Sequence, residues 1–192
     1  MTKEARLLPI VPYGDPVLRQ ETEELDAKYP DLDQLIANMF ATMYGASGVG
    51  LAAPQIGLPV RLFIVDASPF AEEYPELDGF VKAFINPIIH EESGKTWMFN
   101  EGCLSIPGIR EDVERHPNLT IEYYDEEWNL IEEDYDGIIA RVIQHEYDHI
   151  EGILFTDLIS GFRKRVVKGK LKDVESGNVD VTYKMRYPIR KK

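Results

Sequence analysis

The sequence contains little cysteine and no long apolar run. Its 192 residues include one cysteine, which excludes an internal disulfide and fits a reducing compartment. The most apolar stretch, Gly48–Val65, is interrupted by proline and polar residues, so it cannot supply the roughly 18 consecutive apolar residues of a transmembrane helix. No apolar segment follows the charged residues near Met1, so no secretory signal is recognised. These absences lead us to expect a cytoplasmic protein without a membrane partner.

Positive charge is also scarce, and most of it lies near the C-terminus. The chain has 21 Lys and Arg against 34 Asp and Glu, a net charge of −13, which argues against a DNA-binding protein. Residues 161–192 nevertheless hold 11 Lys and Arg against three Asp and Glu. We therefore expect a single domain over residues 1–192 with a basic C-terminal tail at 161–192, and such a tail suggests a polyanionic partner.

Apolar periodicity predicts two long helices and several antiparallel strands. Helical spacing extends from Asp31 to Gly45 and from Gly137 to Gly152, and each segment is bounded by residues that begin or end helices. Strand character appears in residues 61–66 and 81–89. Residues 119–124 and 128–134 flank a short acidic turn, which predicts a hairpin.

The second predicted helix carries titratable side chains on its apolar face. The stripe that begins at Ile138 continues, at the same period, to His145, Glu146 and His149. These three residues form an H-E-x-x-H motif, in which two imidazoles one turn apart can bind one metal ion and the glutamate can take a proton from water. Solvated helix histidines are the alternative, which the apolar stripe disfavours because burying unpaired polar groups is costly.

A catalytic metal site of this kind needs a third protein ligand. A metzincin-type protease would have a histidine six residues after the motif, but Phe155 stands there and no histidine follows His149. Cys103 is the obvious soft donor, because glycine before it and a Pro-Gly pair after it indicate a tight loop that presents a side chain. A lone cysteine is more commonly a buried apolar residue, and Glu175 stays possible as a ligand.

Three motifs together resemble one known family, in that family's order. They are Gly48–Gln55 (GVGLAAPQ), Glu101–Ser105 (EGCLS) and Gln144–His149 (QHEYDH), and the sequence is similar to the peptide deformylases from about Pro12 to about Leu158. The resemblance implies a metal-dependent hydrolase that removes the formyl group from the N-terminal formylmethionine of newly made proteins and releases formate. The implied fold is α+β, with antiparallel β-sheets around a central metal-binding HExxH helix.

The resemblance also implies the roles of individual residues. One divalent ion, Fe²⁺ in the cell and replaceable by Ni²⁺, Co²⁺ or Zn²⁺, would be held by Cys103, His145 and His149. Glu146 matches the catalytic acid and base. Gln55 and the backbone N–H of Leu104 match the groups that polarise the formyl oxygen.

The chemistry of these residues agrees with the implied roles. A cation with one thiolate ligand lowers the pKa of bound water toward ~7, and Glu146 can accept the proton that this water releases. The Gln55 amide and the Leu104 N–H can then stabilise the negative oxygen that develops in the transition state.

The substrate pocket can also be sketched from the sequence. Ile138 and Val142 lie on the same helix face as His145 and could wall an apolar pocket for methionine. Val49 and Gly50 are candidates for the opposite wall, and Arg110 could bind the peptide. Simple core packing explains the apolar positions equally well.

Two other functions stay open from the residues alone. A metalloprotease would share the H-E-x-x-H motif, although Phe155 disfavours it. A non-catalytic protein with a structural metal would need neither Glu146 nor Gln55. The expected partners are N-formylmethionyl nascent peptides and the ribosome, which the basic residues of Arg163–Lys172 could contact.

Overall fold

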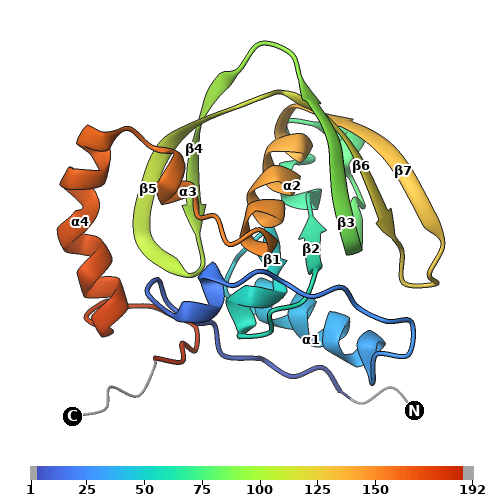
Figure 1. Ribbon diagram of the computed structural model, residues 1–192, viewed down its shortest axis with the longest axis horizontal. Coiled ribbons are helices and arrows are strands. Elements are labelled where there is room, and N and C mark those ends of the chain that lie inside the picture. The colour runs from blue at the N-terminus through green and yellow to red at the C-terminus, as the bar shows by residue number, and fades with distance from the viewer. Residues whose placement is uncertain (1–3, 188–192) are drawn as a thin grey trace.

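The fold places one helix inside a curved sheet. The computed structural model describes residues 4–187, and Figure 1 shows α2 at the centre, enclosed by strands, with α1 below it and α4 at one side. The helices are α1 (Leu32–Gly45), α2 (Gly137–Ile150), α3 (Phe155–Leu158) and α4 (Gly161–Ser176). Short 3₁₀ turns are η1 (Pro16–Arg19), η2 (Ala53–Ile56), η3 (Ser68–Phe70) and η4 (Pro75–Leu77).

All of the strand pairs are antiparallel, as the sequence predicts. A five-stranded sheet has the order β1-β2-β3-β6-β7, and β4 pairs with β5 in a separate hairpin. The α+β fold with antiparallel sheets around the HExxH helix is therefore confirmed. The strands are β1 (Gly50–Ala52), β2 (Leu62–Asp66), β3 (Val81–Ser93), β4 (Trp97–Cys103), β5 (Ile106–Arg115), β6 (Asn118–Tyr124) and β7 (Leu130–Asp136).

Strand β2 is buried on both faces and holds the two halves of the core together. Side chains alternate along a strand, so Phe63 and Val65 pack in the cluster formed with α2, while Leu62 and Ile64 pack in the cluster formed with α1. This double burial explains why the strand is a continuous apolar run rather than an alternating one. The helix that carries the H-E-x-x-H motif therefore lies on a rigid surface.

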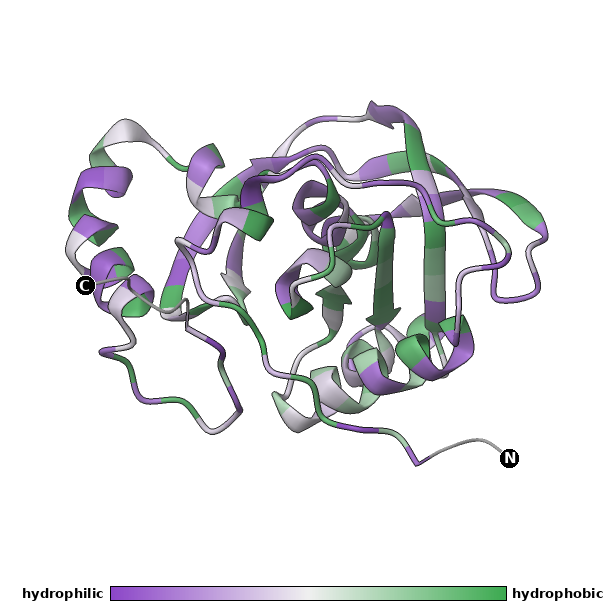
Figure 2. Cartoon of the chain, turned by 60° about the horizontal axis from the view of Figure 1, so that its bottom comes forward, coloured by the Kyte–Doolittle hydropathy of each residue, from purple (hydrophilic) through white to green (hydrophobic). Residues whose placement is uncertain are grey.

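A third apolar cluster attaches α4 to the hairpin. Val167, Leu171 and Val174 repeat at helical spacing and pack with Val113 of β5 and with Phe155. Figure 2 shows this amphipathic character as alternating hydrophobic and hydrophilic positions along α4. Within the described part of the chain, no helix is both long and apolar enough to cross a membrane.

Some expectations lie partly outside the structure. The last basic residues of the predicted tail, Arg190, Lys191 and Lys192, are not among the described residues. The single domain over residues 1–192 stays a prediction. The β4–β5 hairpin was not expected, and Cys103 is the last residue of β4, directly before a tight turn at Leu104 and Ser105.

Candidate active site

Three side chains that could hold a metal ion converge from two elements. Cys103 comes from the end of β4, and α2 contributes His145 and His149, whose ligand atoms lie within 4.8 Å of one another and of the sulfur. The Cys103 Sγ lies 3.2 Å from Nε2 of His149. Helical spacing of four residues places both imidazoles on one face of α2, so the local sequence and the hairpin together build the group.

Glu101 orients one of these histidines. Its Oε2 lies 2.8 Å from Nδ1 of His145, which leaves Nε2 of that ring directed toward the sulfur and the other histidine. A carboxylate in this position fixes the tautomer and raises the basicity of a metal-binding imidazole. Glu101 and Cys103 share one face of β4 because they are two residues apart on a strand.

The Glu101 carboxylate is itself held by two arginines. Arg115 donates to Oε1 and Oε2 at 2.8 and 3.1 Å, and Arg141 donates to Oε1 at 3.0 Å. Only 4% of the Glu101 surface is exposed. Burial alone would raise the pKa of this carboxyl, but hydrogen bonds with His145 and Arg115 outweigh it and hold the pKa well below its usual range. Glu101 is therefore a permanent negative charge.

His149 is suited to bind a metal as a neutral imidazole. It is 1% exposed, and this burial, together with the charge of His145, lowers its pKa well below the ordinary value. Its Nδ1 has no hydrogen-bond partner among the described residues. The other nitrogen, Nε2, lies 3.2 Å from the Cys103 sulfur, on the side of the ring where an ion shared with Cys103 would bind.

The donor set fits a divalent ion. A thiolate and two imidazoles are the soft and intermediate ligands that Zn²⁺, Fe²⁺ and Ni²⁺ accept. Three protein ligands leave one position of a tetrahedral ion open, as hydrolysis requires. Cys103 and His145 also line a cavity of about 980 Å³, so that open position can reach a substrate.

Glu146 lies at the boundary between the core and this cavity. It is 5% exposed, and its Oε2 has no hydrogen-bond partner among the described residues. Gly50 makes room for it, because a Cβ at that position would overlap the Glu146 carboxylate. Burial raises the pKa of Glu146 to about 7, which is where a proton acceptor and donor works best near neutral pH.

Two amide groups face the same cavity. Gln55 receives the backbone N–H of Ala52 on its Oε1 at 2.7 Å, so its Nε2 points to the Cys103 sulfur, 3.4 Å away. Leu104 follows the cysteine in the turn, and its N–H donates to no acceptor among the described residues. Gln55 and Leu104 both line the cavity beside Cys103 and His145, so their N–H groups could donate to a ligand oxygen there.

This constellation agrees with the known proteins that the chain resembles. The family model described as polypeptide deformylase matches residues 7–165. The chain belongs to this family. The peptide deformylase of Christiangramia forsetii is 57% identical over 193 residues, which covers 97% of this chain and 98% of that protein. The enzyme of Flavobacterium psychrophilum is 56% identical, with coverage of 97% and 100%.

Solved structures give the same result. The peptide deformylase of Thermotoga maritima superimposes with a TM-score of 0.73 at 37% identity, covering 81% of this chain and 99% of that chain. A Plasmodium falciparum peptide deformylase in complex with an inhibitor gives a TM-score of 0.75 at 36% identity, covering 86% and 97%. The protein is therefore a metal-dependent hydrolase that removes the formyl group from the N-terminal formylmethionine of nascent peptides.

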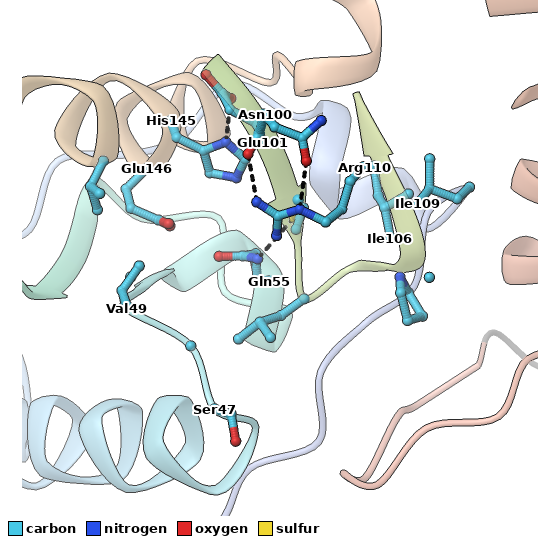
Figure 3. A pocket seen from close by; sticks show the side chains of 18 of the residues that line it. Ser47, Val49, Gln55, Asn100, Glu101, Ile106, Ile109, Arg110, His145 and Glu146 are labelled. Atoms are coloured by element: carbon cyan, nitrogen blue, oxygen red, sulfur yellow. Dashed lines mark hydrogen bonds and ion pairs between the residues drawn. The ribbon is translucent and has the colours of Figure 1, made fainter. Parts of the chain in front are cut away.

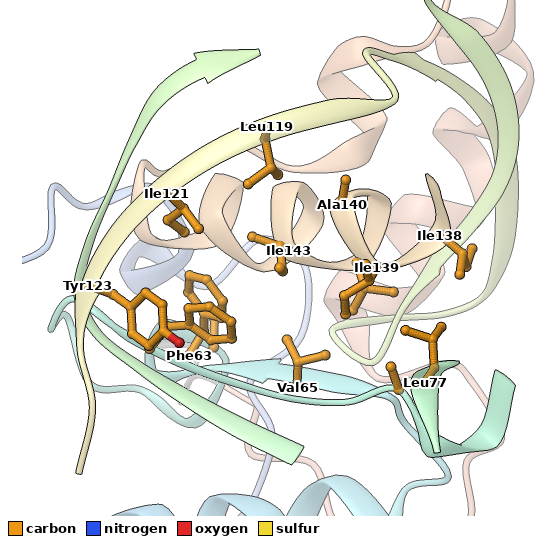
Figure 4. Packing of buried hydrophobic residues seen from close by; sticks show 14 of the residues in the cluster. Phe63, Val65, Leu77, Leu119, Ile121, Tyr123, Ile138, Ile139, Ala140 and Ile143 are labelled. Atoms are coloured by element: carbon orange, nitrogen blue, oxygen red, sulfur yellow. The ribbon is translucent and has the colours of Figure 1, made fainter. Parts of the chain in front are cut away.

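Most of the residues proposed from the sequence to bind substrate line the deformylase cavity. Val49, Gly50, Val142 and Arg110 are all at its surface, and Figure 3 shows Val49, Glu146 and Gln55 around one opening with Arg110 across from them. Arg110 donates to the Asn100 side chain at 2.9 Å. Ile138 is different, because it is not among the lining residues and packs in the core beside Leu77 and Ile139 (Figure 4).

Sequence reasoning missed part of this network. Arg115 forms an ion pair with Glu101 at 2.8 Å. Sequence reasoning did not find that Glu101 also binds His145, or that Arg141 joins the same carboxylate. The available signal was the spacing of two residues between Glu101 and Cys103, which places both side chains on one face once the segment is known to be a strand.

The first prediction concerns Glu101. Glu101→Gln keeps the size of the side chain but leaves two buried guanidinium groups without their carboxylate. We expect metal affinity to fall about 10- to 100-fold and the free energy of unfolding to fall by about 3–5 kcal/mol. Competition with a chelator and urea denaturation measure the two effects.

The matched control for this prediction is Glu114→Gln, which alters an exposed carboxylate on the same hairpin. It should change stability by no more than about 0.5 kcal/mol and leave metal affinity unchanged. Wild-type metal affinity in Glu101→Gln would show that Glu101 does not support the metal ligands.

Proposed function

We propose that deformylation in this protein uses Cys103, His145 and His149 to hold one divalent ion, with Glu146 as the group that moves protons. The observation that carries this proposal is the convergence of the three donor atoms beside the buried Glu146 carboxylate, whose Oε2 has no hydrogen-bond partner among the described residues. When bound, the ion supplies positive charge that polarises the formyl oxygen and acidifies water in the site. Proton transfer and stabilisation of the formyl oxygen are carried out by residues of this protein.

Glu146 serves both proton transfers in the proposed reaction. Its carboxylate takes a proton from the water that attacks the formyl carbon, and it returns this proton to the amine nitrogen as the C–N bond breaks and formate leaves. A pKa near 7 suits both directions. The Gln55 amide and the Leu104 N–H donate to the formyl oxygen while it carries negative charge.

Methionine recognition is proposed for the apolar part of the cavity. Val49 and Val142 line the cavity together with Glu146 and supply branched apolar surface for an unbranched thioether side chain. Arg110 lies at the exposed side, where its guanidinium can donate to peptide carbonyls of the substrate. Ile138 has no part in this proposal, because core packing accounts for it.

The second prediction tests Glu146. Glu146→Gln should keep its metal content and melting temperature but lose at least about 10²-fold in kcat for formate release, with KM little changed. His149→Ala should lose metal and activity together. Glu151→Gln is the matched control, since Glu151 pairs with Arg61 at 2.7 Å outside the cavity. An active, metal-loaded Glu146→Gln enzyme would remove the proposed proton transfer.

The third prediction concerns the identity of the metal, which we propose to be Fe²⁺ in the cell, with Ni²⁺, Co²⁺ or Zn²⁺ as substitutes. A thiolate next to a ferrous ion is sensitive to oxygen. Protein purified without air should contain about one iron per chain, should lose activity in aerated buffer, and should lose it more slowly when loaded with nickel. Stable activity in air with native metal would argue against iron.

The fourth prediction concerns a ribosome contact, which we propose for the basic face of α4. Arg163 is engaged with Glu111 at 2.6 Å and Lys164 with a backbone carbonyl. Arg165, Lys168 and Lys172 are exposed, and exposed cations of this kind bind RNA phosphate in a salt-dependent way. A cytoplasmic location, which such a contact requires, stays a prediction of the sequence.

Co-sedimentation with ribosomes at low and high salt tests this contact. Replacing Arg165, Lys168 and Lys172 with glutamine should reduce the bound fraction at low salt without changing formate release. Replacing the exposed Lys28 and Lys95 with glutamine is the control, because both lie away from α4 in the chain. Unchanged co-sedimentation of the α4 variant would remove the proposal.

A further inference from the structure

The chain returns to the active-site cavity after α4. Asp180, Val181, Thr182 and Tyr183 all line that cavity. These residues follow the last residue of the family-model match, Arg165, by 15 positions or more. The wall that they form is therefore contributed by a part of the chain that carries none of the three deformylase motifs.

Tyr183 connects this wall to the turn that follows the metal-binding cysteine. Its hydroxyl donates to the backbone carbonyl of Leu104 at 2.7 Å. Burial raises the pKa of this hydroxyl above its ordinary value, so it keeps its proton and acts as a donor. The turn contains only Leu104 and Ser105 between the two strands, so this hydrogen bond restrains one of its few free peptide groups.

The segment that carries Tyr183 is itself anchored. The backbone N–H of Ile10 donates to the carbonyl of Lys184 at 2.9 Å, and the backbone N–H of Arg186 donates to the carbonyl of Ile10 at 2.8 Å. The next residue, Val11, donates to the carbonyl of Gln55 at 2.8 Å. Backbone hydrogen bonds therefore link the C-terminal segment through Ile10 and Val11 to Gln55, in addition to the side-chain hydrogen bond from Tyr183 to Leu104.

The same N-terminal stretch reaches the far side of the turn. The backbone N–H of Tyr13 donates to the carbonyl of Ser105 at 2.7 Å. This carbonyl follows the Leu104 carbonyl that accepts from Tyr183. The Arg186 side chain lies against Gly57, directly after the turn that carries Gln55, at a place where a Cβ would overlap it. Residues 10–13 and 183–186 therefore contact both the turn that contains Leu104 and the segment that contains Gln55.

We propose that Tyr183 is a positioning residue for deformylation, whose hydroxyl fixes the conformation of Leu104 so that the Leu104 N–H faces the formyl oxygen. The proposal rests on the role of Leu104 given above. Donors that stabilise a transition state must be held in place before the reaction, because a shift of about 1 Å can cost most of their effect. The Tyr183 hydroxyl holds the Leu104 carbonyl of this turn, and the backbone N–H of Tyr13 holds the Ser105 carbonyl.

Tyr183→Phe removes the hydroxyl and keeps the ring. We expect kcat for formate release to fall about 10-fold, the loss that corresponds to one weakened hydrogen bond in the transition state. KM and metal content should stay near wild type. Calorimetric binding of the deformylated product peptide Met-Ala-Ser should also be unchanged, because the product lacks the formyl oxygen.

Tyr187→Phe is the matched control. Tyr187 lies on the same segment, but its hydroxyl contacts the sulfur of Met185 and it is not among the cavity-lining residues. Its kcat should equal that of wild type. If Tyr183→Phe lowers only the melting temperature and metal content, with unchanged kcat per bound metal, Tyr183 is merely structural and the proposal is overturned.

Leu104→Pro separates this proposal from the one on which it rests, because proline has no N–H to donate. A folded, metal-loaded Leu104→Pro enzyme with wild-type kcat would overturn the role of Leu104 and Tyr183 together. If Leu104→Pro lowers kcat but Tyr183→Phe does not, only the positioning role fails. We expect both variants to have a lower kcat for formate release than wild type. Adding Tyr183→Phe to Leu104→Pro should lower kcat no further.

Discussion

The Glu101 carboxylate joins the two parts of the protein that must meet for the site to exist. Cys103 belongs to the β4–β5 hairpin, which forms a sheet of its own, whereas both histidines belong to the helix α2. Glu101 links them through His145, while Arg115 extends the link to Asp148 on α2 at 2.7 Å. Because breaking such a buried network leaves uncompensated charge, the ligand geometry is coupled to the stability of the fold.

Around this anchored carboxylate, other polar groups are buried without protein partners. Oε2 of Glu146 and Nδ1 of His149 have no hydrogen-bond partner among the described residues. Unpaired buried groups cost stability, and Glu146 lines the cavity in which a ligand could pair with it. Glu101 and Glu146 differ in protonation. Hydrogen bonds with His145 and Arg115 lower the pKa of Glu101 and keep it ionised, whereas burial raises the pKa of Glu146 to about 7, so that it can gain or lose a proton near neutral pH.

The sequence predicts the features that depend on local spacing. The face of α2 that carries the histidines follows from helical periodicity, and the antiparallel pairing follows from short turns between strands. The β4–β5 hairpin escapes this reasoning because its inward positions include Glu111 and Arg115, which hide the alternation of buried and exposed residues. Ile138 was expected to line the substrate pocket. It lies on the same face of α2 as His145, but about two turns earlier, where this face packs in the core. Tyr183 cannot be found from spacing at all, since 79 residues separate it from Leu104.

The central claim is that one cysteine and two histidines from separate elements bind a single catalytic metal ion. X-ray absorption at the metal edge of zinc-loaded protein tests it most directly. The account predicts one sulfur neighbour at about 2.3 Å and two imidazole nitrogens at about 2.0–2.1 Å, with the sulfur signal lost in Cys103→Ala. A metal shell without sulfur in the wild-type protein would contradict it.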